Sequence, residues 1–397
     1  MYYRKIFASF ARYHLLALMY LLLLQPVPRL PWVTSICRLI WLAWLTIPGH
    51  TILYSLLTDS FEKLGHIVGS VLFTFKMLTN FVTYVESMCK AKHYQQLRRL
   101  EDEVDAMLRN HIDVTATFER KRWLRVFYCT LIQITYDILQ LVVIFKDYMS
   151  PVFYYSMPML LIERARYAQI TFTIERQNER SLSLTALLRV LVKANRPKNK
   201  YTSDVWQPYA SWEYENLNSV RLLQGRLCEL YQCVGTCYGW SIIVLLFTTF
   251  FTAVANIFWC IEIVSSDFRL GQFMYDALTM LRLTTLAVVL LITADKARQH
   301  NIQISGLIFK LAKPIGNKTY NDLVSNFSLQ CLQQRLFINV KGFFTLNLPL
   351  LGDSVREETE LEEDDSNEIR KRNFDIEKEH CVGLITVYTK PDEHGDA

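Results

Sequence analysis

Apolar runs long enough to cross a bilayer recur along this chain, and they constrain its fold more than any other feature. A membrane-spanning helix needs roughly 20 predominantly apolar residues. We place six spans, at approximately 36–57, 64–88, 123–145, from 151 onward, 234–264 and 273–293. With 51% hydrophobic and 20% charged residues, the composition disfavours two or three soluble domains. The sequence therefore predicts an all-α, polytopic membrane helical bundle with six clear spans.

The fourth span departs from this simple pattern. Only Val152–Ile162 is cleanly apolar before the charged residues Glu163, Arg164 and Arg166. We expect a long helix that leaves the membrane and continues past Glu175. The polar stretch 204–226 is also predicted to be helical, ahead of the fifth span.

The distribution of basic residues predicts the orientation. Residues 90–122 hold eight Lys and Arg, residues 176–232 hold nine, and residues 295–340 hold six, whereas each loop between them holds one. Because Lys and Arg collect in cytoplasmic loops, these three segments are predicted to be cytoplasmic. The charges are dispersed between apolar runs and form no single basic face, which argues against nucleic acid as a partner.

The same count makes the N-terminus cytoplasmic. Residues 1–34 are predicted to form a cytoplasmic or interfacial segment, because a span over 6–24 would send its basic residues outside. A signal peptide is the alternative, but no small-residue cleavage site follows the apolar run. The sequons at Asn317 and Asn326 are predicted to face the cytoplasm and to carry no glycan.

An abrupt change in charge marks the C-terminal part of the chain. Residues 353–397 carry 15 Asp and Glu against 6 Lys and Arg, whereas residues 1–352 have a net charge of +14. The sequence GFFTLNLPLL resembles the start of another span, but the residues after Gly352 are too charged for a bilayer core. We therefore predict three regions: the segment 1–34, a transmembrane bundle over 35–352 and a charged, disordered tail over 353–397.

The segment before this boundary carries a family resemblance. It resembles the insect gustatory receptor family, whose members carry the pattern G-x-F-T-L-[ND]-x-x-L-L ahead of their last span. Seven positions of the pattern are matched by Gly342, Phe344, Thr345, Leu346, Asn347, Leu350 and Leu351. The rest of residues 1–352 resembles the family in span number, spacing and aromatic content.

The resemblance implies a taste chemoreceptor in the plasma membrane of gustatory sensory neurons. Family members are tetrameric, ligand-gated, nonselective cation channels with seven spans, so the implied partners are a small-molecule tastant, the lipid bilayer and related receptor subunits in a homo- or hetero-tetramer. The family's pore-lining seventh span carries a Thr-Tyr…Gln pattern that is missing after Leu351. The last span is thus missing or replaced, and a nonconducting truncated or accessory subunit is one alternative function.

A polytopic transporter is the other alternative, although the matched broken helices typical of transporters are not evident in the two halves of the sequence. Enzyme motifs such as HExxH, GxSxG or a phosphate-binding glycine loop are missing, so we expect neither catalysis nor a cofactor. The nine cysteines contain no CxxC pair. We expect no metal site, and we interpret Cys228, Cys233 and Cys237 as small apolar residues.

Two observations select candidate ligand-binding residues. Ionisable side chains inside spans are costly and carry a functional hypothesis by default, and Arg282 is the deepest of them. It is expected to pair with an acidic group, to face a ligand cavity or to snorkel. Lys76 and Glu86, ten residues apart, are not expected to pair with each other.

For Glu163, Arg164 and Arg166, we expect snorkelling or packing between subunits rather than ligand contact. The family resemblance points to the outer halves of the spans, where aromatic and polar side chains suit small sugars or bitter organic compounds. The candidate ligand-binding residues are Tyr136, Gln140, Tyr154, Tyr155, Phe251, Trp259, Tyr275 and Arg282.

Overall fold

The structure is a computed structural model, and the residues that it describes all lie before Leu348. They are residues 35–43, 46, 49, 64–109, 131–143, 151–194, 211–265, 270–311 and 317–347. The chain divides into two compact units, Met1–Asn347 and Leu348–Ala397. The predicted N-terminal segment 1–34 and the predicted tail 353–397 lie outside the described residues, so both remain predictions.

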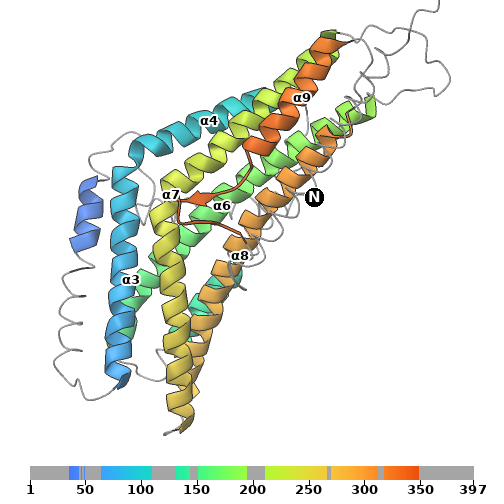
Figure 1. Ribbon diagram of the computed structural model, residues 1–397. Helices are drawn as coiled ribbons and strands as arrows, with labels where there is room; N and C mark the ends of the chain where they lie inside the picture. The colour runs from blue at the N-terminus through green and yellow to red at the C-terminus, as the bar shows by residue number, and fades with distance from the viewer. Residues whose placement is uncertain are drawn as a thin grey trace, which may run out of the picture. The chain divides into compact units, whose positions relative to one another are not determined.

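Long helices make up nearly all of the described chain (Figure 1). They are α3 (Leu64–Cys89), α4 (Ala91–Arg109), α6 (Pro151–Ala194), α7 (Ser211–Ser265), α8 (Leu270–Ile308) and α9 (Lys318–Gln333), together with a short apolar helix at Leu131–Val143. Among the described residues, three helices are long and apolar enough to cross a membrane, and they lie within α3, α7 and α8. The helical bundle was correctly predicted; the count of six spans remains a prediction.

Three helices are much longer than a bilayer is thick. α6 has 44 residues, α7 has 55 and α8 has 39. At about 1.5 Å per residue, α7 extends about 80 Å, against a hydrocarbon core of about 30 Å. The predicted continuation of the fourth helix past Glu175 is therefore confirmed, and the helical stretch predicted before the fifth span is continuous with that span.

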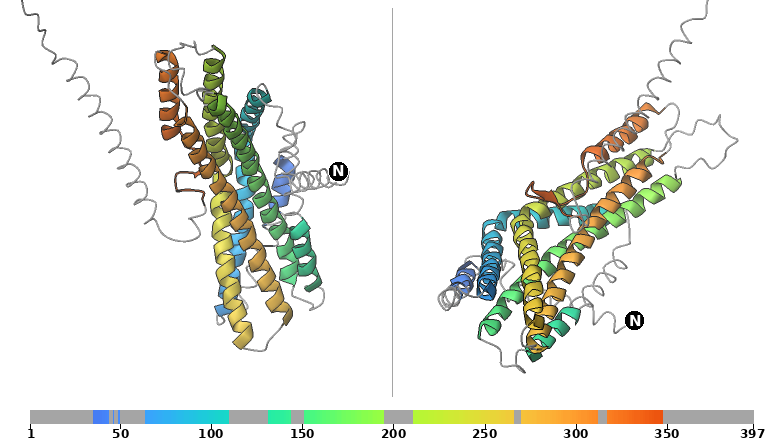
Figure 2. Two further views of the ribbon diagram at one scale, coloured as in Figure 1. Left: turned by 90° about the vertical axis from the view of Figure 1, so that its right-hand side faces the viewer. Right: turned by 60° about the horizontal axis from the view of Figure 1, so that its bottom comes forward.

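These lengths divide the bundle into two halves. We call α3, Leu131–Val143 and the adjoining parts of α6, α7 and α8 the spanning half. The remainder of those three helices, together with α4, α9 and the strands described below, is the extension half. Both views in Figure 2 show α6, α7 and α8 side by side over much of their length. α7 is the central helix, since it packs against α3, α4, α6, α8 and α9.

A β-hairpin follows α9, where the sequence suggested the start of a span. Strand β1 (Asn339–Val340) pairs antiparallel with β2 (Phe344–Thr345). The turn between them has positive φ at Lys341 (54°) and at Gly342 (80°), a conformation that a helix cannot contain. Two consecutive residues of this kind reverse the chain, so the described part of the family signature forms a hairpin and not a helical lead-in.

Apolar side chains are packed very differently in the two halves. One large cluster of buried hydrophobic residues joins α4, α6, α7, α8, α9 and the hairpin, mostly in the extension half. A second cluster, in the spanning half, contains Phe73, Tyr84, Met159, Ile162 and Ala165. The extension half thus has a hydrophobic core of its own, as a water-exposed domain requires, whereas much of the interior of the spanning half is occupied by polar groups.

Candidate functional site

Arg282 lies at the centre of a polar cluster in the spanning half. Its side chain is fully buried, and its Nη1 atom lies 2.8 Å from Asp137 Oδ1 and donates to Gln140 Oε1 at 2.8 Å. Its Nη2 atom donates to the Leu160 carbonyl of α6 at 3.3 Å. The expected acidic partner of Arg282 is therefore Asp137, and the side chain does not snorkel.

Hydrogen bonds extend this cluster along one face of α8. Gln140 donates to Thr279 Oγ1 at 2.7 Å, and Thr279 donates to the Tyr275 carbonyl at 2.9 Å. Tyr275, Thr279 and Arg282 follow one another at spacings of four and three residues, which places them on one helix face. Three predicted candidates, Gln140, Tyr275 and Arg282, are thus brought into one buried region.

Four further charged residues belong to the same region. Arg164 of α6 forms an ion pair with Asp137, which therefore bridges two arginines. Lys76 of α3 lies within electrostatic range of Glu163, Asp276 and Arg282. We call the following residues the Arg282 cluster: Lys76, Asp137, Gln140, Glu163, Arg164, Asp276, Thr279 and Arg282. Its three cations balance its three carboxylates.

Several polar atoms of this cluster are buried without a hydrogen-bond partner among the described residues. They are Glu163 Oε1, Asp276 Oδ2 and Arg282 Nε. The spanning half also leaves Thr252 Oγ1, Asn256 Nδ2 and Gln133 Oε1 in the same condition. A buried polar group without a partner costs roughly 1–3 kcal/mol, and proteins seldom keep several together without a role for them. Such groups are suited to hydrogen bonds with a small polar molecule.

Sequence reasoning missed Asp137 and Asp276 and assigned Glu163 and Arg164 elsewhere. The predicted snorkelling of Glu163 and Arg164 is wrong, because both side chains are buried inside the bundle. Asp137 and Asp276 could have been found by the rule that singled out Arg282, since each is an acidic residue in an apolar segment. Their common partners could not have been found, because Asp137 and Arg282 are 145 residues apart.

The remaining candidates lie elsewhere. Phe251 stacks on Phe75 of α3, with ring centroids 4.2 Å apart, and Trp259 lies against Gly69 of the same helix. Both therefore contribute to the contact between α3 and α7. Tyr136 is half-buried beside Asp137 in sequence. The side chains of Tyr154 and Tyr155 lie outside the described residues, and their proposed role remains a prediction.

A second buried arginine, Arg166, occupies a quite different cluster where the two halves meet. Every nitrogen of its guanidinium group donates a hydrogen bond: Nε to Ser241, Nη1 to Gln169, and Nη2 to Ser241, Glu86 and Tyr94. The guanidinium carbon also lies 4.8 Å from the centre of the Tyr238 ring, a cation–π geometry. We call Glu86, Tyr94, Arg166, Gln169, Tyr238 and Ser241 the Arg166 cluster. Snorkelling is wrong for Arg166 too, and the partner of Glu86 is Arg166 rather than Lys76.

An ion-pair network in the extension half ties α6 to α4. Arg180 contacts both oxygens of Asp105, at 2.7 and 2.8 Å, and donates to Glu101 at 3.2 Å. Burial raises the pKa of the Asp105 carboxyl. The hydrogen bond and the charge of Arg180 lower it, and together with the nearby arginines Arg176 and Arg109 they outweigh burial, so the pKa lies below its ordinary value. This two-pronged contact fixes the angle between the helices.

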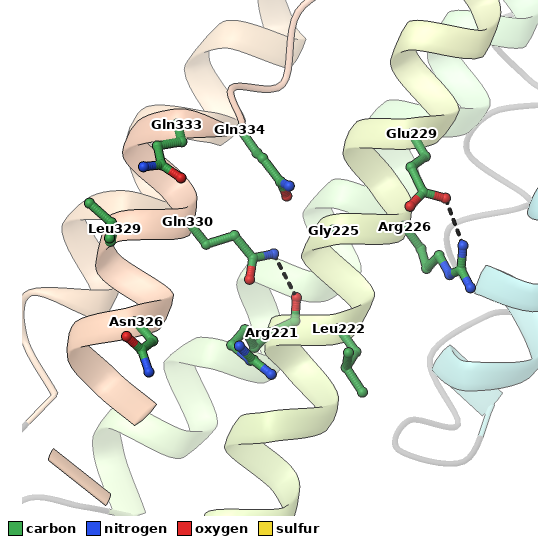
Figure 3. Close-up of a pocket in the computed structure, with 10 residues that line it drawn as sticks. All are labelled: Arg221, Leu222, Gly225, Arg226, Glu229, Asn326, Leu329, Gln330, Gln333 and Gln334. Atoms are coloured by element: carbon green, nitrogen blue, oxygen red, sulfur yellow. Dashed lines mark hydrogen bonds and ion pairs between the residues drawn. The ribbon is translucent and has the colours of Figure 1, made fainter. Parts of the chain in front are cut away.

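A groove of about 480 Å³ separates α7 from α9 in the extension half (Figure 3). Leu329 and Gln330 of α9 line it opposite Arg221 and Gly225 of α7, and Gln330 donates to the Arg221 carbonyl at 3.2 Å. Its walls hold amides and charged groups, and they include the sequon residue Asn326. The groove contains none of the predicted ligand-binding candidates.

The cysteines near the start of the fifth span are structural. Cys228, Cys233 and Cys237 are buried in the large hydrophobic core, and all three are free thiols. Among the described residues, no group of His, Cys, Asp and Glu could hold a metal ion.

Comparison with known proteins identifies one family. Residues 12–355 match the family model described as 7tm Chemosensory receptor. Gustatory receptor 23a of Drosophila melanogaster is 27% identical over 167 residues, which are 42% of this chain and 45% of that protein. The chain thus spans less than half the length of this curated relative.

The fold is similar to that of an insect olfactory receptor. The structure of the olfactory receptor OR5 from Machilis hrabei matches with a TM-score of 0.57 and 14% identity, covering 82% of this chain and 86% of that one. The structure of the same receptor in complex with eugenol matches with a TM-score of 0.58 and 14% identity, covering 87% of this chain and 95% of that one. At this identity, the likeness concerns the fold alone.

Proposed function

The chain belongs to the 7tm chemosensory receptor family, and from this membership we propose that it is a gustatory receptor that detects small organic tastants. Membership of this family makes it a multi-pass membrane receptor and not an enzyme, as the sequence predicted. The observation that carries the proposed tastant site is the Arg282 cluster, which places charged groups and unpartnered polar atoms inside the spanning half.

The charge balance of the cluster indicates the class of ligand. Because its three cations and three carboxylates compensate one another, the cluster offers no net charge to attract an ion. It offers hydrogen-bond acceptors at Glu163 and Asp276 and a donor at Arg282. A neutral molecule with several hydroxyl or carbonyl groups can satisfy these atoms. That the Machilis hrabei olfactory receptor has been solved with eugenol, a small organic compound, supports a ligand of comparable size.

Signalling is proposed to occur through a tetrameric, ligand-gated cation channel in the plasma membrane of gustatory neurons. Assembly with other copies or related receptors is supported by large apolar side chains that are exposed in the extension half. Val190, Leu222, Ile302, Phe309 and Leu329 are each at least half exposed there. Apolar surface outside the membrane favours contact with another subunit.

The test is tastant-evoked current in cells that express this chain. We expect cation current with a subset of neutral polyhydroxylated or phenolic compounds, and loss of that response in Arg282→Met and Asp137→Asn at unchanged surface expression. Arg226→Met, which alters an exposed ion pair with Glu229, is the matched control and should respond as the wild type does. A response that survives both cluster substitutions would exclude this site.

The same cells distinguish the alternatives. A chain that carries no current alone but alters the current of a co-expressed full-length receptor is an accessory subunit. Uptake of a labelled solute without current would instead support a transporter.

The predicted cytoplasmic position of the sequons gives a test of orientation. Asn317 caps α9, its side chain accepting from the Tyr320 amide at 3.1 Å, and Asn326 lines the groove between α7 and α9. We expect endoglycosidase treatment to leave the gel mobility of the chain unchanged. A mobility shift that disappears in Asn317→Gln or Asn326→Gln would reverse the proposed orientation.

A further inference from the structure

One turn of α7, between Thr236 and Ser241, gives its backbone hydrogen bonds to side chains of other elements. In a regular α-helix, the amides of Trp240 and Ser241 donate to the carbonyls of Thr236 and Cys237. Here the same two amides donate to the carboxylate of Glu86 in α3, at 3.0 and 3.1 Å. An amide has only one hydrogen, so each of these amides shares it between Glu86 and the helix, which weakens the helix bond.

The two carbonyls on the other side of this turn are capped as well. The Lys341 ammonium of the hairpin donates to the Thr236 carbonyl at 3.0 Å. The Tyr94 hydroxyl of α4 donates to the Cys237 carbonyl at 3.4 Å. Both donors and both acceptors of one turn of the continuous helix α7 therefore also contact α3, α4 and the hairpin, so three other elements hold this turn.

The hairpin fits directly onto this turn. A Cβ atom at Gly235 would lie 2.2 Å from the Asn339 carbonyl oxygen, and one at Gly239 would lie 2.7 Å from Lys341 Cγ. At Gly235 the neighbour is backbone, so only glycine leaves room for this approach. The Phe343 ring at the tip of the hairpin also meets Trp240 edge-to-face, with centroids 6.1 Å apart. The turn of α7 that Glu86 contacts is thus also the turn on which the hairpin lies.

Lys341 has an unfavourable backbone conformation in the turn of the hairpin. Its φ of 54° lies in the left-handed region that glycine adopts readily and that other residues seldom do. A glycine would suit the turn better, but it could not reach the Thr236 carbonyl. Strain of this kind persists where the surrounding contacts hold the residue in place.

The carboxylate of Glu86 is itself held in place by neighbouring side chains. It pairs with Arg166 at 3.0 Å and accepts a hydrogen bond from the Ser241 hydroxyl, and both side chains of the ion pair are almost completely buried. Separating an ion pair that is so completely buried is costly in free energy. The carboxylate is therefore a fixed point between α3, α6 and α7.

We propose that Glu86 is a positioning residue that holds a hinge in α7 and, through that hinge, the hairpin Asn339–Thr345. A shift of α3 moves Glu86, and the amides of Trp240 and Ser241 move with it. The seat of the hairpin moves with them, because Gly235 and Gly239 lie on that turn. The hinge is a property of the fold and stands whether or not the chain conducts.

Its use in signalling rests on the proposed function. Lys76 of the Arg282 cluster and Glu86 lie on the same helix, about 15 Å apart at 1.5 Å per residue. Through α3, a ligand that displaces Lys76 would thereby move the hairpin Asn339–Thr345.

Amide hydrogen exchange of the purified full chain in lipid nanodiscs tests the hinge without any ligand. In Glu86→Gln, we expect exchange about ten-fold faster at Trp240 and Ser241, because a charged acceptor is lost. The hairpin peptide 338–346 should exchange faster too. Glu101→Gln, which weakens the ion pairs between α4 and α6, is the matched control and should leave α7 and the hairpin unchanged.

Lys341→Gly gives a second test with opposite expectations, and it does not disturb the buried ion pair. If Lys341 served only the turn, glycine would relieve its strain and leave exchange in α7 unchanged or slower. If Lys341 caps the hinge, exchange at Trp240 and Ser241 should rise about five-fold, as for one lost hydrogen bond. Lys341→Arg keeps a donor and should restore the wild-type rates.

Three results would overturn the proposal. The first is unchanged exchange of α7 in Lys341→Gly. The second is a Glu86→Gln chain whose α7 amides exchange faster while the hairpin keeps its wild-type rate. The third is uniformly faster exchange throughout the bundle in Glu86→Gln, which would contradict a local hinge.

Discussion

Arg166 and Arg282 are both completely buried, and the comparison between them separates a structural role from a candidate binding role. Arg166 donates from every nitrogen and lies against an aromatic ring, in a cluster whose partners come from α3, α4, α6 and α7. Arg282 leaves its Nε atom without a partner among the described residues and lies near carboxylates with free oxygens. The two arginines are equally buried but differ in how completely their hydrogen bonds are satisfied, and this difference is the basis for proposing a binding role for Arg282 alone.

The largest expected effect is that of removing Arg166. Arg166→Met should lower the stability of the bundle by about 3–5 kcal/mol, because it leaves Glu86 buried and without its cation. Thermal unfolding of the purified chain in nanodiscs measures the loss. The exposed Arg226→Met variant is the control and should keep the wild-type melting temperature. If Arg166→Met is as stable as the wild type, the Arg166 cluster does not have the structural role described.

Removing Arg282 should have a smaller effect on stability. Arg282→Met should cost about 1–3 kcal/mol, because Asp137 keeps its ion pair with Arg164 and one nitrogen of Arg282 forms no bond that could be lost. The same thermal measurement compares the two variants directly. Equal losses for Arg166→Met and Arg282→Met would show that both clusters are structural, and the comparison would fail.

The smallest effect concerns pH and the extension half. The pKa of Asp105 is depressed in the folded chain, so its contact with Arg180 stabilises the fold above the ordinary carboxyl pKa of about 4 and is lost as the pH falls through the folded pKa. Wild type should therefore be more stable than Asp105→Asn at pH 6, and this advantage should disappear in strong acid. An advantage that persists below pH 2 would contradict this account.

The two clusters also show how far sequence reasoning reaches into a membrane bundle. The rule that charges inside spans have a purpose singled out Arg282, and of its expected surroundings the acidic partner is found, at Asp137; its role in ligand binding remains a prediction. For Glu163 and Arg164, snorkelling, which was expected from their place at the end of an apolar run, was wrong, whereas packing between subunits remains a prediction. Their helix continues inside the protein, so neither side chain had water to reach.

The hairpin illustrates the same limit at short range. Its residues were correctly singled out as the family signature, but an apolar sequence such as GFFTLN does not reveal its own backbone conformation. Lys341 adopts a left-handed φ because Thr236, 105 residues earlier, offers a carbonyl to its ammonium group. Local propensity could not have indicated this.

The sequence by itself determined the helical membrane architecture, the continuation of the fourth helix beyond its apolar run and the family signature. These properties depend on the length and periodicity of apolar runs, which are local. Only the tertiary structure decided which charges meet. Glu86 and Arg166 are separated by 80 residues and Asp137 and Arg282 by 145, so their pairing depends on how four helices pack. Two arginines that look alike in the sequence thereby acquire different surroundings.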